Sequence, residues 1–374
     1  MKIAVITMHA VKNYGSALQT FATQQVLSRL GYETEIINYI RKKNIDSNLI
    51  DVWTSKEKGL RKIAKKMLMY PTIKKWIRVW GNYLQTYIHL SAVTYTEMKD
   101  FSVTPVQADI LCTGSDQVWN SGWNDGVEYP FYLSFADDNT PKISFSASFG
   151  KEKLDENEIE IVKPLLQKYD YITVREQSAV SILNNMGIKD VSFTLDPTLF
   201  LTKEQWKNHM KKSKPDEPYI LVYQLNKDKN FDKMAVNFAK SKKMKLVRLC
   251  LRYDQIILPG RKKFIPEIRE FLSLINNAEY VITDSFHATA FSINFNKQFF
   301  SVLPQKYNCR LKGFLDIFDL ENRIVSNYLD FESAGTIDYG QVNKILDDER
   351  KKSMEHLKYA LRFATDKIKQ GESF

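Results

Sequence analysis

The sequence predicts an α/β protein with two Rossmann-like, doubly wound domains and a long C-terminal helix. Three observations lead to this prediction. Short β-branched runs alternate with segments of helical periodicity in both halves of the chain, as expected for parallel sheets with helical crossovers. The chain has 374 residues, which suits two domains better than one core. A polar, Lys-rich stretch with Pro215 and Pro218 interrupts the alternation once.

The first half begins with a strand at residues 2–7. A helix follows at residues 16–30, because apolar side chains recur at helical spacing until Gly31 ends the pattern. We expect further strands at residues 34–39, 108–113, 142–146, 171–174 and 191–195, and helices at residues 155–168 and 177–186. These segments define an N-terminal domain over residues 1–205, with a basic insertion at about residues 50–90.

The alternation restarts after Pro218. We expect strands at residues 219–225, 245–251, 280–283 and 299–303, and helices at residues 231–241, 265–276 and 287–295. They define a C-terminal domain over residues 218–338. Apolar side chains at helical spacing then predict one long amphipathic helix in residues 339–374, which we expect to pack across both domains.

The net charge of +10 is concentrated in the insertion. Nine Lys and Arg side chains crowd residues 56–78, interleaved with apolar side chains that include Trp76 and Trp80. A basic amphipathic segment with Trp is typical of proteins that lie on an anionic membrane. The alternative is a solvated helix face with ordinary core contacts. Nucleic acid is disfavoured as a partner, because no recognition motif accompanies the charge.

Three observations predict the cellular compartment of the protein. The start of the chain lacks the long apolar core of a signal peptide, and no run approaches the length of a membrane-spanning helix. The three Cys show no metal-ligand spacing, and Cys112 and Cys250 fall in apolar, strand-like runs. We therefore expect free thiols in a cytoplasmic protein, with the basic segment at the inner face of the plasma membrane.

The most informative segment is residues 281–291, where a β-branched run breaks into polar residues before a helix of small side chains. This pattern presents Asp284, Ser285 and His287 at a strand end and a helix N-terminus. Open α/β sheets bind ligands at that edge. Imidazole can carry a proton near neutral pH, so His287 is a candidate acid. The alternative is a capped, hydrogen-bonded structural histidine.

Residues 113–120 follow another apolar strand and combine polar side chains with Trp119. Sugar recognition needs planar hydrogen-bonding groups and an aromatic face, so Ser115, Gln117 and Trp119 are candidate acceptor ligands. The Asp116 carboxylate can bind or deprotonate a hydroxyl. The alternative is a turn in which Trp119 is buried.

Other strand ends also carry polar side chains. Asn13 and Tyr14 follow the first strand and would project into the edge, unless they belong to a routine capped loop. Arg175 closes a strand before a helix, where its planar guanidinium can grip a carboxylate or phosphate. The alternative for Arg175 is a structural ion pair, for example with Glu176. Gln224 ends the first strand of the second half.

Lys306, Arg310 and Arg323 lie beyond the last strands and would bring positive charge to the site, with solvated surface as the alternative for each. No cofactor is indicated. No second His or Cys stands at zinc spacing, no D-x-D motif appears, and the absence of G-x-G-x-x-G disfavours a nicotinamide enzyme.

Six short segments of the chain, taken in order, resemble the polysaccharide pyruvyl transferase family. They are NYGSALQ at residues 13–19, GSDQVWN at 114–120, SASFG at 146–150, VRE at 174–176, LDPT at 195–198 and TDSFH at 283–287. Each is weak alone, but the ordered set is specific and spans nearly the whole chain.

The resemblance implies two Rossmann-like domains facing a cleft, as in GT-B glycosyltransferases. It implies phosphoenolpyruvate as donor, a sugar hydroxyl pair as acceptor and a cyclic pyruvate ketal as product. His287 would be the catalytic acid, and Arg175 would match the family arginine before a helix. Some members carry Arg where this chain has Ser285, so we expect Lys306, Arg310 or Arg323 to supply donor contacts instead.

The resulting hypothesis is a pyruvyl transferase that acts on a lipid-linked precursor of a surface or capsular polysaccharide. His287 would protonate the donor and Asp116 would assist the attacking hydroxyl. The expected donor ligands are Arg175, Ser285, Gln224, Lys306 and Arg310, and the expected acceptor ligands are Asn13, Tyr14, Ser115, Gln117 and Trp119. Two alternatives are a GT-B glycosyltransferase that uses a nucleotide sugar and a non-catalytic glycan-binding protein.

Overall fold

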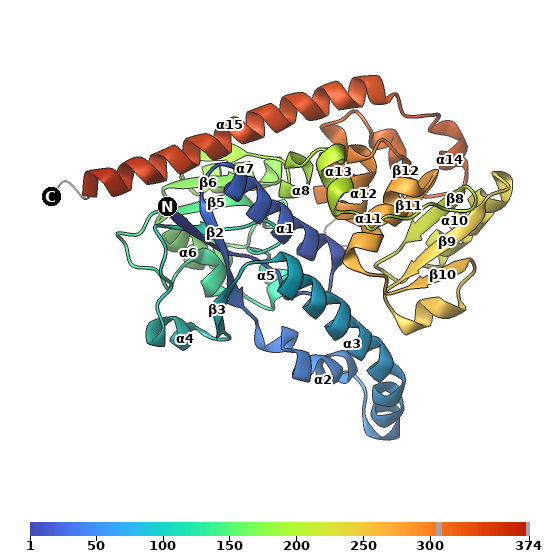
Figure 1. The fold of residues 1–374 in the computed structure, drawn as a ribbon, viewed down its shortest axis with the longest axis horizontal. Helices are drawn as coiled ribbons and strands as arrows, with labels where there is room; N and C mark the ends of the chain where they lie inside the picture. Colours follow the sequence, from blue (N-terminus) through green and yellow to red (C-terminus); the bar gives the residue numbers. More distant parts are fainter. Residues whose placement is uncertain (304–308, 372–374) are drawn as a thin grey trace. The chain divides into compact units, whose positions relative to one another are not determined.

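The computed structural model describes residues 1–303 and 309–371 (Figure 1). Residue contacts divide the chain into two compact units. Unit 1 comprises residues 1–45, 84–201 and 346–374, and unit 2 comprises residues 46–83 and 202–345. Each unit is built on one parallel sheet whose strands alternate with helices, so the predicted α/β class is confirmed.

Unit 1 contains a seven-stranded sheet with the order β3-β2-β1-β4-β5-β6-β7. The strands are β1 (Lys2–Ile6), β2 (Glu33–Tyr39), β3 (Leu90–Tyr95), β4 (Ile110–Thr113), β5 (Lys142–Ala147), β6 (Tyr171–Val174) and β7 (Val191–Phe193). The chain runs outward from β1 to β3 and then returns to the other side of β1 at β4. Doubly wound sheets bind ligands where the strand order reverses in this way.

The helices of unit 1 connect these strands. They are α1 (Tyr14–Arg29), α4 (Met98–Val103), α5 (Ser121–Asn124), α6 (Glu156–Leu166), α7 (Gln177–Asn185) and α8 (Pro197–Phe200), with short 3-10 turns at Lys42–Asn44 and Tyr129–Tyr132. The central strands β1 and β4 are almost wholly buried. Strands covered on both faces read as continuous apolar runs, which is why the sequence located them well.

Unit 2 contains a five-stranded parallel sheet with the order β10-β9-β8-β11-β12. The strands are β8 (Tyr219–Tyr223), β9 (Lys245–Cys250), β10 (Arg261–Phe264), β11 (Tyr280–Thr283) and β12 (Gln298–Ser301). Its principal helices are α9 (Lys203–His209), α10 (Lys229–Ser241), α11 (Ile268–Asn277), α12 (Phe286–Asn294), α13 (Cys309–Asp316) and α14 (Leu329–Ser333). Here the strand order reverses between β8 and β11.

Two strands that the sequence analysis missed, β3 and β10, lie at sheet edges. β10 has the sequence Arg-Lys-Lys-Phe and no fully buried residue, and β3 buries only Tyr95. An edge strand with polar side chains lacks the apolar run that identifies a central strand. The missed elements are therefore those with the weakest patterns.

The basic segment forms α2 (Leu49–Thr54) and α3 (Gly59–Tyr87), and residues 46–83 group with unit 2 rather than with the N-terminal half. Trp76 Nε1 donates to the Leu251 carbonyl at 3.1 Å. Trp76 and Trp80 are buried, which corrects the expectation that their rings lie at a membrane surface. The helix that carries them is bonded to unit 2 through the Trp76 ring.

The long C-terminal helix is confirmed as α15 (Tyr339–Gly371), which begins in unit 2 and continues in unit 1 (Figure 1). No helix in the part of the chain that the structure describes is both long and apolar enough to cross a membrane. Cys112 and Cys250 are buried free thiols.

We expect the protein to lose stability in mild acid because of His209, which lies at the end of α9. Burial, and then the charge of Arg269, lower its pKa from 6.5 to about 4, and its Nε2 lies 2.9 Å from the Tyr83 hydroxyl oxygen. Between pH 6.5 and pH 4, His209 binds a proton in the unfolded chain but stays neutral in the folded chain. We therefore expect the free energy of unfolding to fall as pH drops from 6.5 to 4, with a contribution on the order of 3 kcal/mol from this residue.

Urea unfolding at several pH values measures this effect. His209→Gln keeps an acceptor for the Tyr83 hydroxyl and should show a shallower decline over the same interval. An identical decline in the wild type and the variant would contradict the assignment.

Candidate functional site

In unit 1, two of the segments singled out from the sequence, residues 13–19 and 114–120, follow β1 and β4, the strands between which the strand order reverses. Ile6, the last residue of β1, pairs with Thr113, the last residue of β4, and the Gly114 N–H donates to the Ile6 carbonyl at 2.8 Å. Thr7 Oγ1 donates to the Ser115 carbonyl, also at 2.8 Å. The loops after β1 and β4 are therefore bonded to each other at the carboxyl edge of the sheet, the usual place for a ligand.

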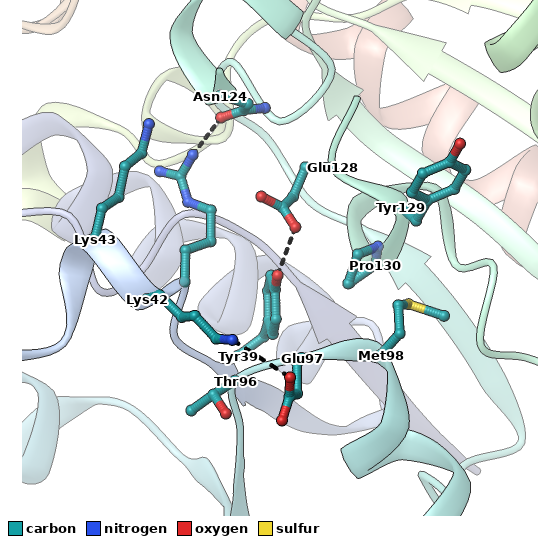
Figure 2. Close-up of a pocket in the computed structure, with 11 residues that line it drawn as sticks. Tyr39, Lys42, Lys43, Thr96, Glu97, Met98, Asn124, Glu128, Tyr129 and Pro130 are labelled. Atoms are coloured by element: carbon teal, nitrogen blue, oxygen red, sulfur yellow. Dashed lines mark hydrogen bonds and ion pairs between the residues drawn. The ribbon is translucent and has the colours of Figure 1, made fainter. Parts of the chain in front are cut away.

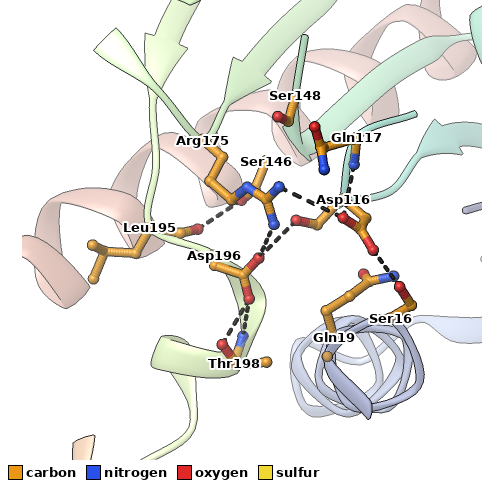
Figure 3. A network of polar contacts seen from close by, with 12 residues as sticks. Ser16, Gln19, Asp116, Gln117, Ser146, Ser148, Arg175, Leu195, Asp196 and Thr198 are labelled. Carbon is orange, nitrogen blue, oxygen red and sulfur yellow. Dashed lines mark hydrogen bonds and ion pairs between the residues drawn. The ribbon is translucent and has the colours of Figure 1, made fainter. Parts of the chain in front are cut away.

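A buried polar cluster, here called the Asp116 network, occupies this edge (Figure 3). Its members are Ser16, Ser115, Asp116, Arg175, Glu176 and Asp196. Asp116 Oδ2 accepts from Ser16 Oγ at 2.5 Å, and Ser115 Oγ donates to Asp196 Oδ2 at 3.0 Å. Nitrogens of the Arg175 guanidinium lie 2.7 Å from Asp196 Oδ2, 3.6 Å from Glu176 Oε1 and 3.7 Å from Asp116 Oδ1. Three separate strand ends and the first turn of α1 thus supply one cluster.

Asp116 has an unusual backbone conformation. Its φ of 78° lies in the left-handed region, which side chains with a Cβ rarely adopt. Its Oδ1 accepts from the Gln117 N–H at 2.9 Å, and the residue is 6% exposed. Strained residues persist where their surroundings fix them, and they cluster at functional sites. This geometry keeps Asp116 as the leading candidate in unit 1.

Arg175 is neutralised from within unit 1. Burial acts to lower its pKa, but the charges of Asp196, Glu176 and Asp116 outweigh burial and raise the pKa overall. One guanidinium among three carboxylates leaves an excess of negative charge, which opposes a second anion at the same place. The geometry therefore favours the structural ion-pair alternative for Arg175, and its contact with a donor stays a prediction.

Two acceptor candidates are core residues, which corrects the expectation from the sequence. Tyr14 is fully buried, and Trp119 is 1% exposed. Trp119 Nε1 donates to the Phe131 carbonyl at 3.0 Å, and its ring stacks against Tyr132. Neither ring presents a face to a sugar, because Tyr14 is fully buried and Tyr132, Phe149 and Tyr169 surround the Trp119 ring. The alternative of a turn with Trp119 buried is confirmed.

The polar acceptor candidates make local hydrogen bonds. Ser115 is fully buried within the Asp116 network. Asn13 caps α1, where its Oδ1 accepts from the Gly15 N–H at 2.8 Å, and Gln117 Oε1 accepts from Asn120 Nδ2 at 2.7 Å. Asn13 and Gln117 are partly exposed, so they are the acceptor candidates that the fold leaves within reach of a ligand.

Unit 2 repeats this construction at its own reversal, between β8 and β11. Thr283, the last residue of β11, pairs with Tyr223 and donates from Oγ1 to the Tyr223 carbonyl at 2.7 Å. Asp284 follows, and its two oxygens accept from the N–H groups of Leu225 at 2.6 Å and Asn226 at 2.8 Å. Burial raises the pKa of Asp284, although these hydrogen bonds act against the shift. Asp284 therefore fixes the loop after β8.

Helix α12 begins directly after this turn. Ser285 is its N-cap, and the Ser285 Oγ accepts from the Ala288 N–H at 3.4 Å. His287 lies in the first turn, 6% exposed, with its ring edge-on to Phe286. A helix N-terminus offers backbone N–H groups and partial positive charge to an anion. The predicted placement of His287 at a strand end and helix N-terminus is confirmed, while its role stays a prediction.

Two of the donor candidates are structural residues. Gln224 is 1% exposed, donates to the Asp228 carbonyl at 3.1 Å and accepts from Arg248 at 3.3 Å. Arg323 is also 1% exposed, and its guanidinium donates to the carbonyls of Ala334 and Gly335. Arg323 is therefore removed from the candidates for donor binding, because its charge is directed into the fold.

Among the described residues, Arg310 is the basic donor candidate that remains beside the start of α12. It lies on α13, is partly exposed, and has its guanidinium carbon 5.1 Å from the centre of the Phe286 ring. Phe286 precedes His287, so Arg310 brings positive charge to the first turn of α12. Lys306 lies outside the described residues.

The sequence analysis did not include Ser16, Glu176 or Asp196 among its site residues. A shared signal was present: Asp116, Glu176, Asp196 and Asp284 are all carboxylates within three residues after the end of a strand. Among residues 1–303 and 309–371, no group of three or more His, Cys, Asp and Glu is arranged to hold a metal ion. The expectation of metal-free chemistry stays a prediction.

Comparison with known proteins identifies the family. The family model for polysaccharide pyruvyl transferase matches residues 13–305, and the chain belongs to that family. No curated protein sequence matches it significantly. The S. aureus MnaA–UDP co-structure is similar in fold, with a TM-score of 0.53, 13% identity, and coverage of 97% of this chain and 98% of that chain. The structure of Methanocaldococcus jannaschii UDP-GlcNAc 2-epimerase in complex with UDP-GlcNAc and UDP is also similar. Its TM-score is 0.51 at 14% identity, with coverage of 97% of this chain and 100% of that chain. These likenesses support a GT-B-like fold.

Arg175→Met should destabilise the protein strongly, because it leaves buried carboxylates without their cation. Breaking a buried pair in this way costs about 3–5 kcal/mol. Urea unfolding should show the loss, whereas Lys168→Met, which removes an exposed partner of Asp138, should leave the midpoint almost unchanged. Normal stability combined with weak phosphoenolpyruvate binding would instead return Arg175 to the donor site.

Proposed function

We propose that this member of the polysaccharide pyruvyl transferase family moves the enolpyruvyl group of phosphoenolpyruvate onto a hydroxyl pair of a sugar. The acceptor would be a precursor of a surface or capsular polysaccharide, and the products a pyruvate ketal and phosphate. The observation that carries the proposal is the position of His287, in the first turn of α12 and within the matched range 13–305. A proton donor stands there at a place suited to a small anion.

The donor is assigned to the carboxyl edge of unit 2. Phosphoenolpyruvate carries a carboxylate and a phosphate, so it needs several N–H donors or cations in a small volume. The N-terminus of α12 supplies backbone N–H groups, and Arg310 supplies a guanidinium beside Phe286. The capping bond of Ser285 holds the turn in shape for this contact.

The reaction begins with proton transfer from His287 to the methylene carbon of phosphoenolpyruvate, which makes C2 electrophilic. One sugar hydroxyl adds to C2, the C–O bond to phosphate breaks, and the second hydroxyl closes the ketal. Two hydroxyl protons are released: one replaces the proton that His287 gave to the new methyl group, and the other leaves with phosphate. General acid catalysis of this kind typically contributes 10²–10⁴-fold, roughly.

The acceptor is assigned to the carboxyl edge of unit 1, for the opposite electrostatic reason. The excess negative charge of the Asp116 network disfavours an anion, whereas a neutral sugar hydroxyl can bind there and give its proton to a carboxylate. Asp116 is the proposed base. Asn13 and Gln117, both partly exposed, are the proposed hydrogen-bonding partners of the sugar.

The rival function is a glycosyltransferase that uses a nucleotide sugar, because the similar structures were solved with UDP or UDP-GlcNAc. Family membership favours pyruvyl transfer, because similarity of fold alone does not identify a substrate. Thermal melting separates the two functions. Phosphoenolpyruvate should raise the melting temperature and UDP-GlcNAc should not, because a ligand that binds only the folded state stabilises it.

A membrane-bound acceptor is favoured by the surface of α2 and α3. Seven large apolar side chains of this segment are exposed: Val52, Trp53, Leu60, Ile63, Met67, Leu68 and Tyr70. Leu60, Ile63 and Met67 recur at helical spacing and therefore share one face. Lys and Arg side chains alternate with them. We propose that this face, rather than Trp76 and Trp80, lies on an anionic leaflet and presents the enzyme to lipid-linked glycan.

His287→Ala should keep the melting temperature of the wild type and lower kcat at least ~10²-fold. The assay is transfer from phosphoenolpyruvate to a panel of p-nitrophenyl hexosides, followed by mass spectrometry for the added carboxyethylidene group. Arg310→Ala should chiefly raise the KM for phosphoenolpyruvate, while Arg362→Ala on the exposed side of α15 should change neither constant. Wild-type turnover by His287→Ala would remove His287 from the acid role.

Flotation with vesicles tests the membrane proposal. The wild type should float with phosphatidylglycerol vesicles and stay behind with phosphatidylcholine vesicles. The triple variant Leu60→Ser, Met67→Ser and Leu68→Ser should lose flotation, whereas Ile257→Ser, which changes an exposed apolar side chain elsewhere in unit 2, should retain it. Equal recovery with both lipids, or full flotation of the triple variant, would contradict the proposal.

A further inference from the structure

Unit 1 contains a cavity of about 340 Å³ that no sequence motif indicated (Figure 2). Three segments line it: residues 39–43 at the end of β2, residues 96–98 after β3, and residues 124–130 between α5 and β5. The ends of β2 and β3 belong to the same carboxyl edge as the Asp116 network. The volume lies at the lower end of the roughly 300–1,000 Å³ that is typical of small-molecule sites.

The lining combines apolar surface with polar side chains that hold one another in place (Figure 2). The Tyr39 hydroxyl donates to Glu128 Oε1 at 2.6 Å, and Lys42 Nζ lies 3.4 Å from Glu97 Oε2. Arg41 donates to the side-chain carbonyl of Asn124. Carboxylate, amide and ammonium groups thus converge on one space, and each can exchange hydrogen bonds with hydroxyl groups.

Tyr129 adds an aromatic ring to this wall. It is 45% exposed, in contrast to Trp119 and Tyr14, whose rings are buried in the core. An exposed aromatic ring beside planar polar groups is the combination that a sugar ring needs, because its C–H face packs on the ring while its hydroxyls bond to the polar groups. Of these three aromatic side chains, Tyr129 is the one that both lines the cavity and is exposed.

The charge balance of the cavity argues against an anionic ligand. Arg41, Lys42 and Lys43 contribute three positive charges, but Glu97 and Glu128 oppose two of them. Lys43 is also paired with Asp125 at 2.5 Å. Glu97 is shared with Lys99, whose Nζ lies 2.7 Å from Glu97 Oε1, so the group as a whole carries one surplus positive charge. A donor with a carboxylate and a phosphate carries about three negative charges, which one surplus cation does not balance. A neutral, polyhydroxylated ligand fits this balance of donors and acceptors.

The cavity is connected to the Asp116 network through the loop after β4. Asn124 Nδ2 donates to the Val118 carbonyl at 2.8 Å, and Asn120 caps α5 by accepting from the Trp123 N–H at 3.1 Å. The charge of Asp116 also acts on Arg41. The same loop therefore shapes the wall of the cavity and carries the candidate base.

We propose that this cavity binds a sugar ring of the acceptor glycan, with Tyr129 packed against the ring and Glu128 and Asn124 bonded to its hydroxyls. This inference rests on the proposed function for the identity of its ligand as acceptor, but sugar binding itself does not require phosphoenolpyruvate. It deepens the assignment of unit 1 to the acceptor by naming a second subsite beside the Asp116 network.

Saturation-transfer difference NMR tests the inference with methyl glycosides of galactose, glucose, mannose and N-acetylglucosamine as probes, without phosphoenolpyruvate. At least one glycoside should receive saturation from the wild type. Tyr129→Ala and Glu128→Gln should each reduce that signal at least five-fold, roughly the effect of losing one ring or hydrogen-bond contact. Tyr359→Ala, which removes an exposed tyrosine on α15, should retain the full signal. Melting temperatures equal to that of the wild type establish that the variants fold.

The outcomes separate this inference from the proposed function. No signal with any of the glycosides, or an undiminished signal in Tyr129→Ala, overturns the sugar site. Pyruvyl transfer by Tyr129→Ala with an unchanged KM for the p-nitrophenyl hexoside would also overturn it, while the proposed function would stand. Glycoside binding that depends on Tyr129, in a protein that transfers no pyruvyl group to any hexoside, would support the sugar site and reject the proposed function.

Discussion

One buried guanidinium organises the carboxyl edge of unit 1. The carboxylates of Asp116, Glu176 and Asp196 arrive from three different strand ends, and each would be costly to bury alone. Arg175 lies within 3.7 Å of all three, so the turns that carry them are held in one arrangement. The unusual backbone of Asp116 is sustained by this arrangement. A site whose groups must keep a fixed geometry gains from such preorganisation.

In unit 2 the loops at the carboxyl edge are also held by a buried carboxylate, but its partners are uncharged backbone N–H groups. Asp284 accepts backbone N–H groups from the loop after β8, and this contact joins the two strands between which the order reverses. The turn then leads directly into α12, so the fixed loop and the helix N-terminus are parts of one structure. The contrast in charge is the more informative feature. Unit 1 gathers carboxylates at its edge, whereas unit 2 offers a helix N-terminus and Arg310, and the proposed assignment of acceptor and donor rests on this contrast.

Much of the fold was predictable, because central parallel strands and their helices have strong apolar patterns. From those patterns we could predict where β1, β4, β5 and β6 lie in the sequence, and that His287 follows β11. The edge strands β3 and β10 did not, since half-exposed strands lack such a pattern. At the site, the strand-end position of Asp116 was predictable, but its partners were not. Ser16, Arg175 and Asp196 are brought to Asp116 by pairing of strands that are far apart in the sequence.

The sequence by itself determined the composition of each strand end, and so which chemical groups were available: a histidine at a helix N-terminus, carboxylates soon after strands, and a basic amphipathic segment. Only the tertiary structure decided which of these groups are exposed. Trp119, Tyr14, Trp76 and Trp80 have the same side chains as ligand-binding or interfacial residues, yet packing places them in the core, while Tyr129 and Leu60 remain outside. Exposure depends on neighbours contributed by distant parts of the chain, and local sequence does not specify them.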